Sequence, residues 1–164
     1  MRKLILGAMA AFLLLTGCAA EPSPAEPVLL FQCRAQIVTD SMEVSCTVRR
    51  SAADMTKIEI ESPESLSGFV VNQSGSELSL SYQGIAIAQG TLPEDSFILQ
   101  MLAALDIAAQ DGGLVSLGDG SFSGQIQNRD FVLKVDQKTG FLLQLELFNP
   151  DIQITFSEMT PISA

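Results

Sequence analysis

The side chains able to do chemistry are few in this sequence of 164 residues, and their types exclude the common catalytic centres. There is no histidine, so Ser/His/Asp and Cys/His arrangements are excluded and a zinc site lacks its commonest ligand. The carboxylates Glu94 and Asp95 are accounted for by the dipole of a helix that begins there. Asp111, Asp119 and Asp130 lie near glycines without EF-hand spacing, which favours loop formation over calcium binding. The sequence predicts no enzyme, no metal and no cofactor.

The first 17 residues have the pattern of a secretory signal peptide, and a cysteine follows them. Arg2 and Lys3 precede an apolar run, Leu4–Leu15, that is too short for a comfortable membrane-spanning helix. The ending Leu-Thr-Gly-Cys at 15–18 resembles the lipobox of bacterial lipoproteins. This resemblance implies that Cys18 is lipidated and anchors the mature chain on the extracytoplasmic face of the cell membrane. The alternative is a signal peptide cut elsewhere, with Cys18 incidental.

The predicted mature chain is strongly acidic. Loss of Arg2 and Lys3 with the signal peptide leaves seven basic residues against nineteen acidic ones, a formal charge of about −12. Such a charge disfavours nucleic acid and anionic lipid surfaces as partners. Residues 18–27 form a Pro-rich acidic tether that holds the body on the order of 20 to 30 Å from the bilayer. Residues 28–164 are predicted to form a single domain.

The other two cysteines, Cys33 and Cys46, lie in neighbouring segments with strand-like alternation. Val28–Val38 and Met42–Val48 each place the cysteine on the apolar face. A tight turn at 39–40 sets the two cysteines directly opposite each other, at a separation that a disulfide spans. We therefore expect a Cys33–Cys46 disulfide in the exported protein, with two buried free thiols as the alternative. No neighbouring motif lowers a thiol pKa, which argues against a redox-active role.

One helix stands among many short strands. It is predicted over Thr91–Gln110, with an apolar stripe and a capping box formed by Thr91 and Glu94. About nine or ten strands alternate apolar and polar residues, as in an antiparallel sheet covered on one side. They are expected at Val28–Val38, Met42–Val48, Lys57–Glu61, Gly68–Asn72, Glu77–Tyr82, Gly84–Ala88, Phe122–Ile126, Phe131–Val135, Phe141–Phe148 and Ile152–Phe156.

The sizes of the sheet and the helix decide the fold class. Ten strands at about 4.8 Å make a sheet nearly 50 Å wide, whereas the helix is roughly 27 Å long and 10 to 12 Å thick. One helix does not cover a flat sheet of that width, so the sheet must curl around it. The prediction is an α+β fold, a strongly curved antiparallel half-barrel wrapped around one main helix, with apolar concave surface left uncovered unless the barrel closes.

Several short motifs resemble the LolA/LolB-like lipoprotein carriers and related lipoproteins of Gram-positive bacteria. They are Ser62-Pro63, the Leu-Ser-Tyr-Gln-Gly run around Tyr82, Thr139-Gly140 before an apolar strand, and the closing strand Ile154–Ser157. The resemblance implies a half-barrel with helical cover, whose hollow holds lipoprotein acyl chains in the carriers. The chain departs from that pattern because a strand follows the tether directly, where the carriers usually open with a helix. In Gram-positive relatives the same shape serves as a tethered protein partner.

The predicted function is a non-enzymatic binding module on the membrane, with a lipid or acyl ligand in the concave face of the sheet. The alternative is a tethered partner of another envelope protein, with a filled core and no ligand. Nine inward apolar residues are the cavity candidates, although each of them alone is more typical of core packing. They are Phe31, Phe69, Tyr82, Phe97, Met101, Leu105, Phe122, Phe131 and Phe156.

Overall fold

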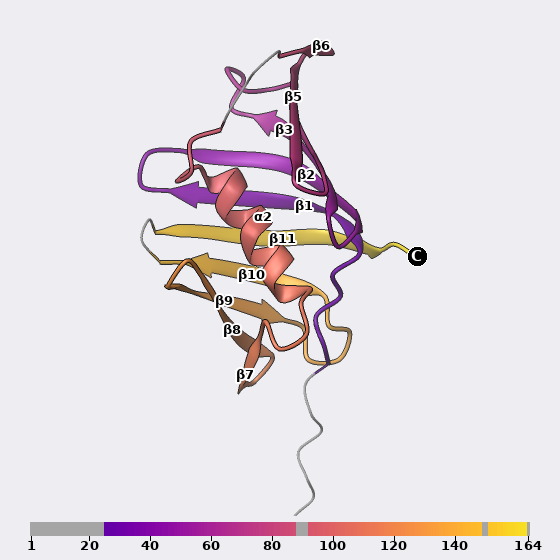
Figure 1. Cartoon of the computed structure of the whole chain (residues 1–164), viewed down its shortest axis with the longest axis vertical. Helices are drawn as coiled ribbons and strands as arrows, with labels where there is room; N and C mark the ends of the chain where they lie inside the picture. Colours follow the sequence, from indigo (N-terminus) through magenta and orange to yellow (C-terminus); the bar gives the residue numbers. More distant parts are fainter. Residues whose placement is uncertain (1–24, 88–91, 149–150, 164) are drawn as a thin grey trace, which may run out of the picture.

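The computed structural model describes residues 25–87, 92–148 and 151–163, which form one open, curved antiparallel sheet with a helix across it (Figure 1). The elements are β1 (Phe31–Thr39), β2 (Glu43–Ala52), β3 (Met55–Ser62), β4 (Phe69–Ser74), β5 (Glu77–Tyr82), β6 (Ile85–Ala86), α2 (Phe97–Ala108), β7 (Val115–Gly118), β8 (Ser121–Ile126), β9 (Arg129–Val135), β10 (Leu142–Leu147) and β11 (Ile152–Pro161). The predicted signal peptide and Cys18 lie outside the described residues. Within those residues, no helix has the length and apolar character needed to cross a membrane.

The sheet consists of two meanders that join at the middle. The strand order is β6-β5-β4-β3-β2-β1-β11-β10-β9-β8-β7, so β1 to β6 run outward to one edge and β7 to β11 return from the other. Helix α2 connects the two edges by crossing the sheet (Figure 1). The pairing of β1 with β11 then closes the two meanders into one sheet.

Alternation of apolar and polar residues builds the core. In β1, Phe31, Cys33, Ala35 and Ile37 are buried and the residues between them are exposed, as expected for a sheet with one covered face. Phe31 and Phe156 meet across the central strands in an edge-to-face contact, with ring centroids 6.3 Å apart. The buried apolar core of the described residues runs from Phe31 to Phe156. The chain from Ala25 onward, called the body below, therefore carries that whole core.

Helix α2 begins later than predicted, at Phe97. Its N-cap is Ser96, whose side chain accepts a hydrogen bond from the amide of Leu99. The predicted capping box at Thr91 and Glu94 is therefore wrong as the start of this helix; Thr91 itself lies outside the described residues. Glu94 precedes the helix, and its carbonyl accepts a hydrogen bond from the buried Gln100 side chain at 2.9 Å. Asp95 also precedes the helix, so the first turn holds no acidic residue.

The structure has eleven strands in the described residues, against the nine or ten predicted. The unpredicted strand is β7, which lies between the predicted helix and the predicted strand Phe122–Ile126. All four of its residues are exposed, so it has no buried face, and its alternation of Val115 and Leu117 with Ser116 and Gly118 is only four residues long. The expectation of a curved antiparallel sheet with a single main helix is confirmed at this coarser level.

The β1–β2 hairpin differs from the prediction by two residues of register. Val38 pairs with Glu43, and the Thr39 hydroxyl accepts hydrogen bonds from the amides of Ser41 and Met42, which gives a longer loop than the expected two-residue turn. Cys33 consequently pairs with Val48, and Cys46 pairs with Ala35. The expected Cys33–Cys46 disulfide is absent from this structure, which has two buried free thiols instead.

Burial keeps both thiols protonated. The pKa of Cys33 is raised to about 12, first by burial and then by the nearby Cys46. The pKa of Cys46 is also raised to about 12, first by burial and then by the negative charge of Glu61. Both cysteines therefore act as small apolar core residues rather than as nucleophiles.

A buried arginine ties the helix to three strands. Arg50 on β2 is fully buried, and its Nη1 lies 2.9 Å from Asp106 Oδ1 on α2 and 3.0 Å from Thr56 Oγ1 on β3. Its Nη2 donates to the carbonyls of Ala53 and Leu105. The other oxygen of Asp106 accepts a hydrogen bond of 2.8 Å from Gln73 on β4. This polar clamp (Arg50, Thr56, Gln73 and Asp106) fixes where α2 sits on the sheet.

The first described residues lie against the β9–β10 turn. The amide of Val28 donates to the carbonyl of Gly140 at 2.8 Å. Gly140 has φ +71°, and a Cβ there would lie 2.1 Å from the carbonyl oxygen of Glu26, so only glycine fits. Asp136 accepts hydrogen bonds from Thr139 and Lys138, which lower the pKa of its carboxyl. The Thr139-Gly140 motif thus forms the turn against which the first described residues pack.

The free thiols predict that reductant leaves the body unchanged. Without a disulfide there is no cross-link to lose, so dithiothreitol should not shift the thermal midpoint. A thiol reagent under denaturing, non-reducing conditions should label Cys33 and Cys46, and neither should react in the native protein because both side chains are buried. Mass spectrometry counts the labels. An unlabelled denatured chain would contradict the free-thiol assignment.

The raised thiol pKa values predict a loss of stability at alkaline pH. In the unfolded chain each thiol ionises near its ordinary value of 9, whereas in the folded chain it stays protonated to about 12. Between these values the unfolded state binds fewer protons, so the free energy of unfolding falls by roughly 1 kcal/mol per pH unit for each thiol. Urea unfolding between pH 8 and 11 measures this slope. The Cys33→Ala/Cys46→Ala body should have a flatter slope, and an identical slope would refute the effect.

The polar clamp predicts that removing one partner of the ion pair lowers the free energy of unfolding more than replacing both partners does. Asp106→Ala should lower the free energy of unfolding by about 3 kcal/mol, because it leaves the buried Arg50 guanidinium without its counter-charge. Replacing both partners, as Arg50→Met/Asp106→Leu, should recover much of that loss. Asp111→Ala removes an exposed carboxylate just past the helix and should change stability by less than about 0.5 kcal/mol. Equal losses in the single and double variants would overturn this account of the clamp.

Candidate functional site

An apolar hollow lies at the β6 edge of the sheet. Its volume is about 390 Å³, within the range of small-molecule pockets. It is lined by six residues, which come from β4, β5, β6, the segment after β6 and the β3–β4 turn. They are Ser65, Leu66, Phe69, Tyr82, Ile85 and Ile87.

A tight turn between β5 and β6 brings two of these residues together. Gln83 and Gly84 have φ values of +48° and +80°, and this two-residue turn sets Ile85 directly opposite Tyr82. The amide of Ile87 then donates to the carbonyl of Leu80, which carries Ile87 to the same side. The hairpin thus adds two isoleucines to the side of the sheet that Tyr82 faces.

The other wall comes from β4 and the turn before it. Phe69 pairs with Tyr82, so the two aromatic side chains share one face. The amide of Leu66 donates to the carbonyl of Pro63, and the amide of Phe69 donates to the carbonyl of Leu66. This compact turn folds Leu66 toward Phe69. The hollow is therefore built by local hydrogen bonds within one stretch of chain, 63–87.

The hollow belongs to the concave face that α2 covers elsewhere. On β4, Gln73 points to the helix because it hydrogen-bonds Asp106, and Val71 and Phe69 follow at alternate positions on the same face. Val71 is buried and Phe69 is only partly buried. Burial of the concave face of β4 therefore decreases along the strand from Val71 to Phe69.

Exposure confirms that this surface is uncovered in the described structure. Tyr82, Ile85 and Ile87 are 39%, 74% and 40% exposed. None of the six lining residues carries a charge, and their side chains offer only the hydroxyls of Ser65 and Tyr82 as polar groups. Such a surface binds apolar groups by burial and has no group for acid, base or nucleophilic chemistry.

The nine cavity candidates divide among three places. Phe31, Met101, Leu105, Phe122, Phe131 and Phe156 are buried in the core cluster. The space beside Met101, which is fully buried, is therefore filled by side chains. Phe69 and Tyr82 line the hollow, and Phe97 lines a separate pocket of about 300 Å³ at the start of α2. A ligand role for any of them stays a prediction.

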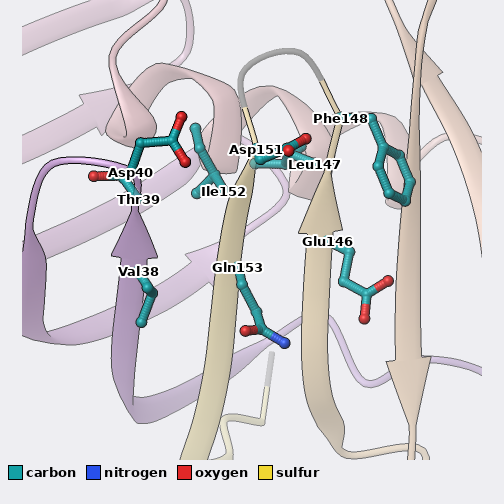
Figure 2. A pocket seen from close by; sticks show the side chains of 9 residues that line it. All are labelled: Val38, Thr39, Asp40, Glu146, Leu147, Phe148, Asp151, Ile152 and Gln153. Carbon is teal, nitrogen blue, oxygen red and sulfur yellow. The ribbon is translucent and has the colours of Figure 1, made fainter.

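A further pocket, of about 400 Å³, lies at the loop ends of β1, β10 and β11 (Figure 2). Its lining is Val38, Thr39, Asp40, Glu146, Leu147, Phe148, Asp151, Ile152 and Gln153. Figure 2 shows the Val38, Gln153 and Glu146 side chains on the face turned away from the helix. Glu146 is paired with Lys134 at 2.8 Å. In the described part of the chain no group of three or more cysteine or carboxylate side chains is placed to hold a metal.

Four residues of the hollow are absent from the candidates predicted by sequence: Ser65, Leu66, Ile85 and Ile87. Ile85 and Ile87 alternate within the possible strand Gly84–Ala88, so their pattern did place them on one face. Leu66 lies in a turn and has no periodic signal. Its inward position depends on the hydrogen bonds of the 63–68 turn, which composition does not reveal.

Comparison with known proteins gives fold likeness only. Neither protein-family models nor curated proteins match the sequence. Among solved structures, an uncharacterised conserved protein from Thermus thermophilus has 15% identity and a TM-score of 0.49, with 82% of this chain and 79% of that chain covered. A LolA superfamily protein from Nitrosomonas europaea has 11% identity and a TM-score of 0.43, with 82% and 86% covered.

A DUF1329 family protein from Desulfovibrio piger has 10% identity and a TM-score of 0.37, with 80% of this chain and 85% of that chain covered. A LolA superfamily protein is thus among the structures that this chain resembles, as the sequence motifs predicted. At these identities and TM-scores the likeness concerns general architecture, and no function is transferred from it.

Proposed function

We propose that the protein is a membrane-anchored, extracytoplasmic and non-enzymatic binding module whose apolar hollow holds an acyl chain or a similar apolar ligand. The observation that carries this proposal is the uncovered apolar surface on the concave face at β4, β5 and β6. Exposed apolar surface of this kind is costly in water unless a ligand or partner covers it.

The size and chemistry of the hollow favour a slender apolar ligand. At about 390 Å³ it lies near the lower end of ligand pockets, which fits one acyl chain better than a whole two-chain lipid. The two hydroxyls supply the only side-chain polar groups of the lining. Affinity would come from burial of methylene groups, each worth about 0.8 kcal/mol.

The membrane anchor in this proposal is Cys18. It rests on the lipobox-like ending of the signal peptide, which lies outside the described residues. Ala25 and Val28 hydrogen-bond the β9–β10 turn, which is compatible with a tether that joins the body at this turn. Metabolic labelling with a palmitate analogue tests it, since Cys18→Ala should lose the label.

A second function, a tethered partner for another envelope protein, is favoured by a different observation. The core under α2 is packed, and the edge strand β7 exposes Val115 and Leu117, which are 63% and 59% exposed. An open sheet edge is suited to pairing with a strand of another protein. This function does not require that the hollow binds a ligand.

The hollow predicts that its rim residues control binding of a neutral apolar probe. Ile85→Asn should weaken binding of Nile red to the body about tenfold, because roughly 1.5 kcal/mol of apolar contact is lost. Stability should change little, since Ile85 is already 74% exposed. Fluorescence titration and thermal melting measure the two effects.

Leu143→Asn is the matched control. Leu143 is 48% exposed on β10, outside the hollow, and its replacement should leave probe binding unchanged. Equal weakening by both variants would move the binding site away from the hollow. A body that takes up neither Nile red nor any component of a lipid extract would overturn the ligand function in favour of the protein-partner function.

A further inference from the structure

Basic residues are absent from the part of the chain that builds the hollow. Between Ile58 and Asn128 the sequence contains no lysine and no arginine, and it contains nine aspartates and glutamates. This stretch forms β4, β5, β6, α2, β7, β8 and most of β3. The walls of the hollow therefore offer no positive charge to a ligand.

The basic residues of neighbouring strands are engaged elsewhere. Arg50 is fully buried in the polar clamp, where Asp106 is its counter-charge. Lys57 alternates with the buried Thr56 and Ile58, so it lies on the opposite, convex face, and its Nζ is 3.0 Å from Glu59 Oε2. Arg49 pairs with Lys57 and lies on the same convex face, where its Nη1 donates to Gln32 Oε1 at 3.5 Å. None of these three side chains is available to neutralise an anion in the hollow.

One acidic residue lies next to the lining. Glu64 directly precedes Ser65 and Leu66 in the β3–β4 turn, and it is exposed. Its negative charge is thus one residue along the chain from the lining, where it disfavours a ligand group of the same sign. The predicted mature charge of about −12 adds a field of the same sign.

We propose that the hollow selects its ligand by charge: it accepts a single apolar chain whose polar end is uncharged, and it rejects the same chain ending in a carboxylate. This inference rests on the proposed ligand function and names its substrate class. A carboxylate at the mouth would lose hydration without gaining a partner of opposite charge. A hydroxyl or amide end would meet the Ser65 and Tyr82 hydroxyls at no such cost.

Competition between two ligands with the same chain tests the proposal. Monomyristoylglycerol and myristate would each displace Nile red from the body at pH 8 and low ionic strength. Myristate should bind at least about tenfold more weakly, and the difference should shrink at 0.5 M NaCl because salt screens exposed charges. Equal affinities at low salt would overturn the selection by charge. Failure of both ligands and of Nile red would instead overturn the proposed function itself.

Two charge-reversal variants separate the local effect from net charge. Glu64→Lys and Glu77→Lys change the total charge equally, and both glutamates are exposed. Glu77 lies at the β4–β5 turn, at the opposite end of β5 from Tyr82. Glu64→Lys should strengthen myristate binding severalfold more than Glu77→Lys, with little effect on monomyristoylglycerol. Equal gains in myristate affinity in the two variants would show that the net charge of the body, and not the charge beside the hollow, controls binding. That result would overturn the proposed selection by the hollow.

Discussion

The area of the sheet relative to its single helix is the constraint on which this structure depends. Eleven strands at about 4.8 Å span roughly 50 Å, whereas the twelve residues of α2 extend about 18 Å. The helix contacts β8 in one half of the curved sheet and hydrogen-bonds Gln73 of β4 in the other, but its length does not cover the whole width of the sheet. Curvature of the sheet reduces the uncovered surface. The apolar surface that stays uncovered is the hollow at β4, β5 and β6.

The polar clamp decides which part of the sheet is left uncovered. Arg50 and Asp106 hold the C-terminal half of α2 over β2, with Thr56 and Gln73 as further partners on β3 and β4. A buried ion pair contributes little net stability, yet it disfavours other placements of the helix because each would leave Arg50 unpaired. Position of the helix and position of the hollow are thus two results of one interaction.

Alternation of residue types predicted the strands, the one-sided sheet and the shortage of helix. It did not predict the Cys33–Cys46 register, because register depends on a loop hydrogen bond made by Thr39, and a two-residue change keeps both cysteines on the same face. It missed β7, which has no buried face. The area argument predicted that apolar concave surface would remain, but its location depends on Arg50. Alternation in β2 puts Arg50 on the buried face, whereas its charge is typical of an exposed residue.

The hollow and the first described residues lie in opposite halves of the sheet. Ala25 and Val28 hydrogen-bond the β9–β10 turn, whereas the hollow is built on β4, β5 and β6 (Figure 1). Six strand positions separate β10 from β5, on the order of 30 Å along the sheet. With the proposed anchor at Cys18, the tether joins the body far from the hollow. A ligand in the hollow would then bind in the half of the sheet away from the tether.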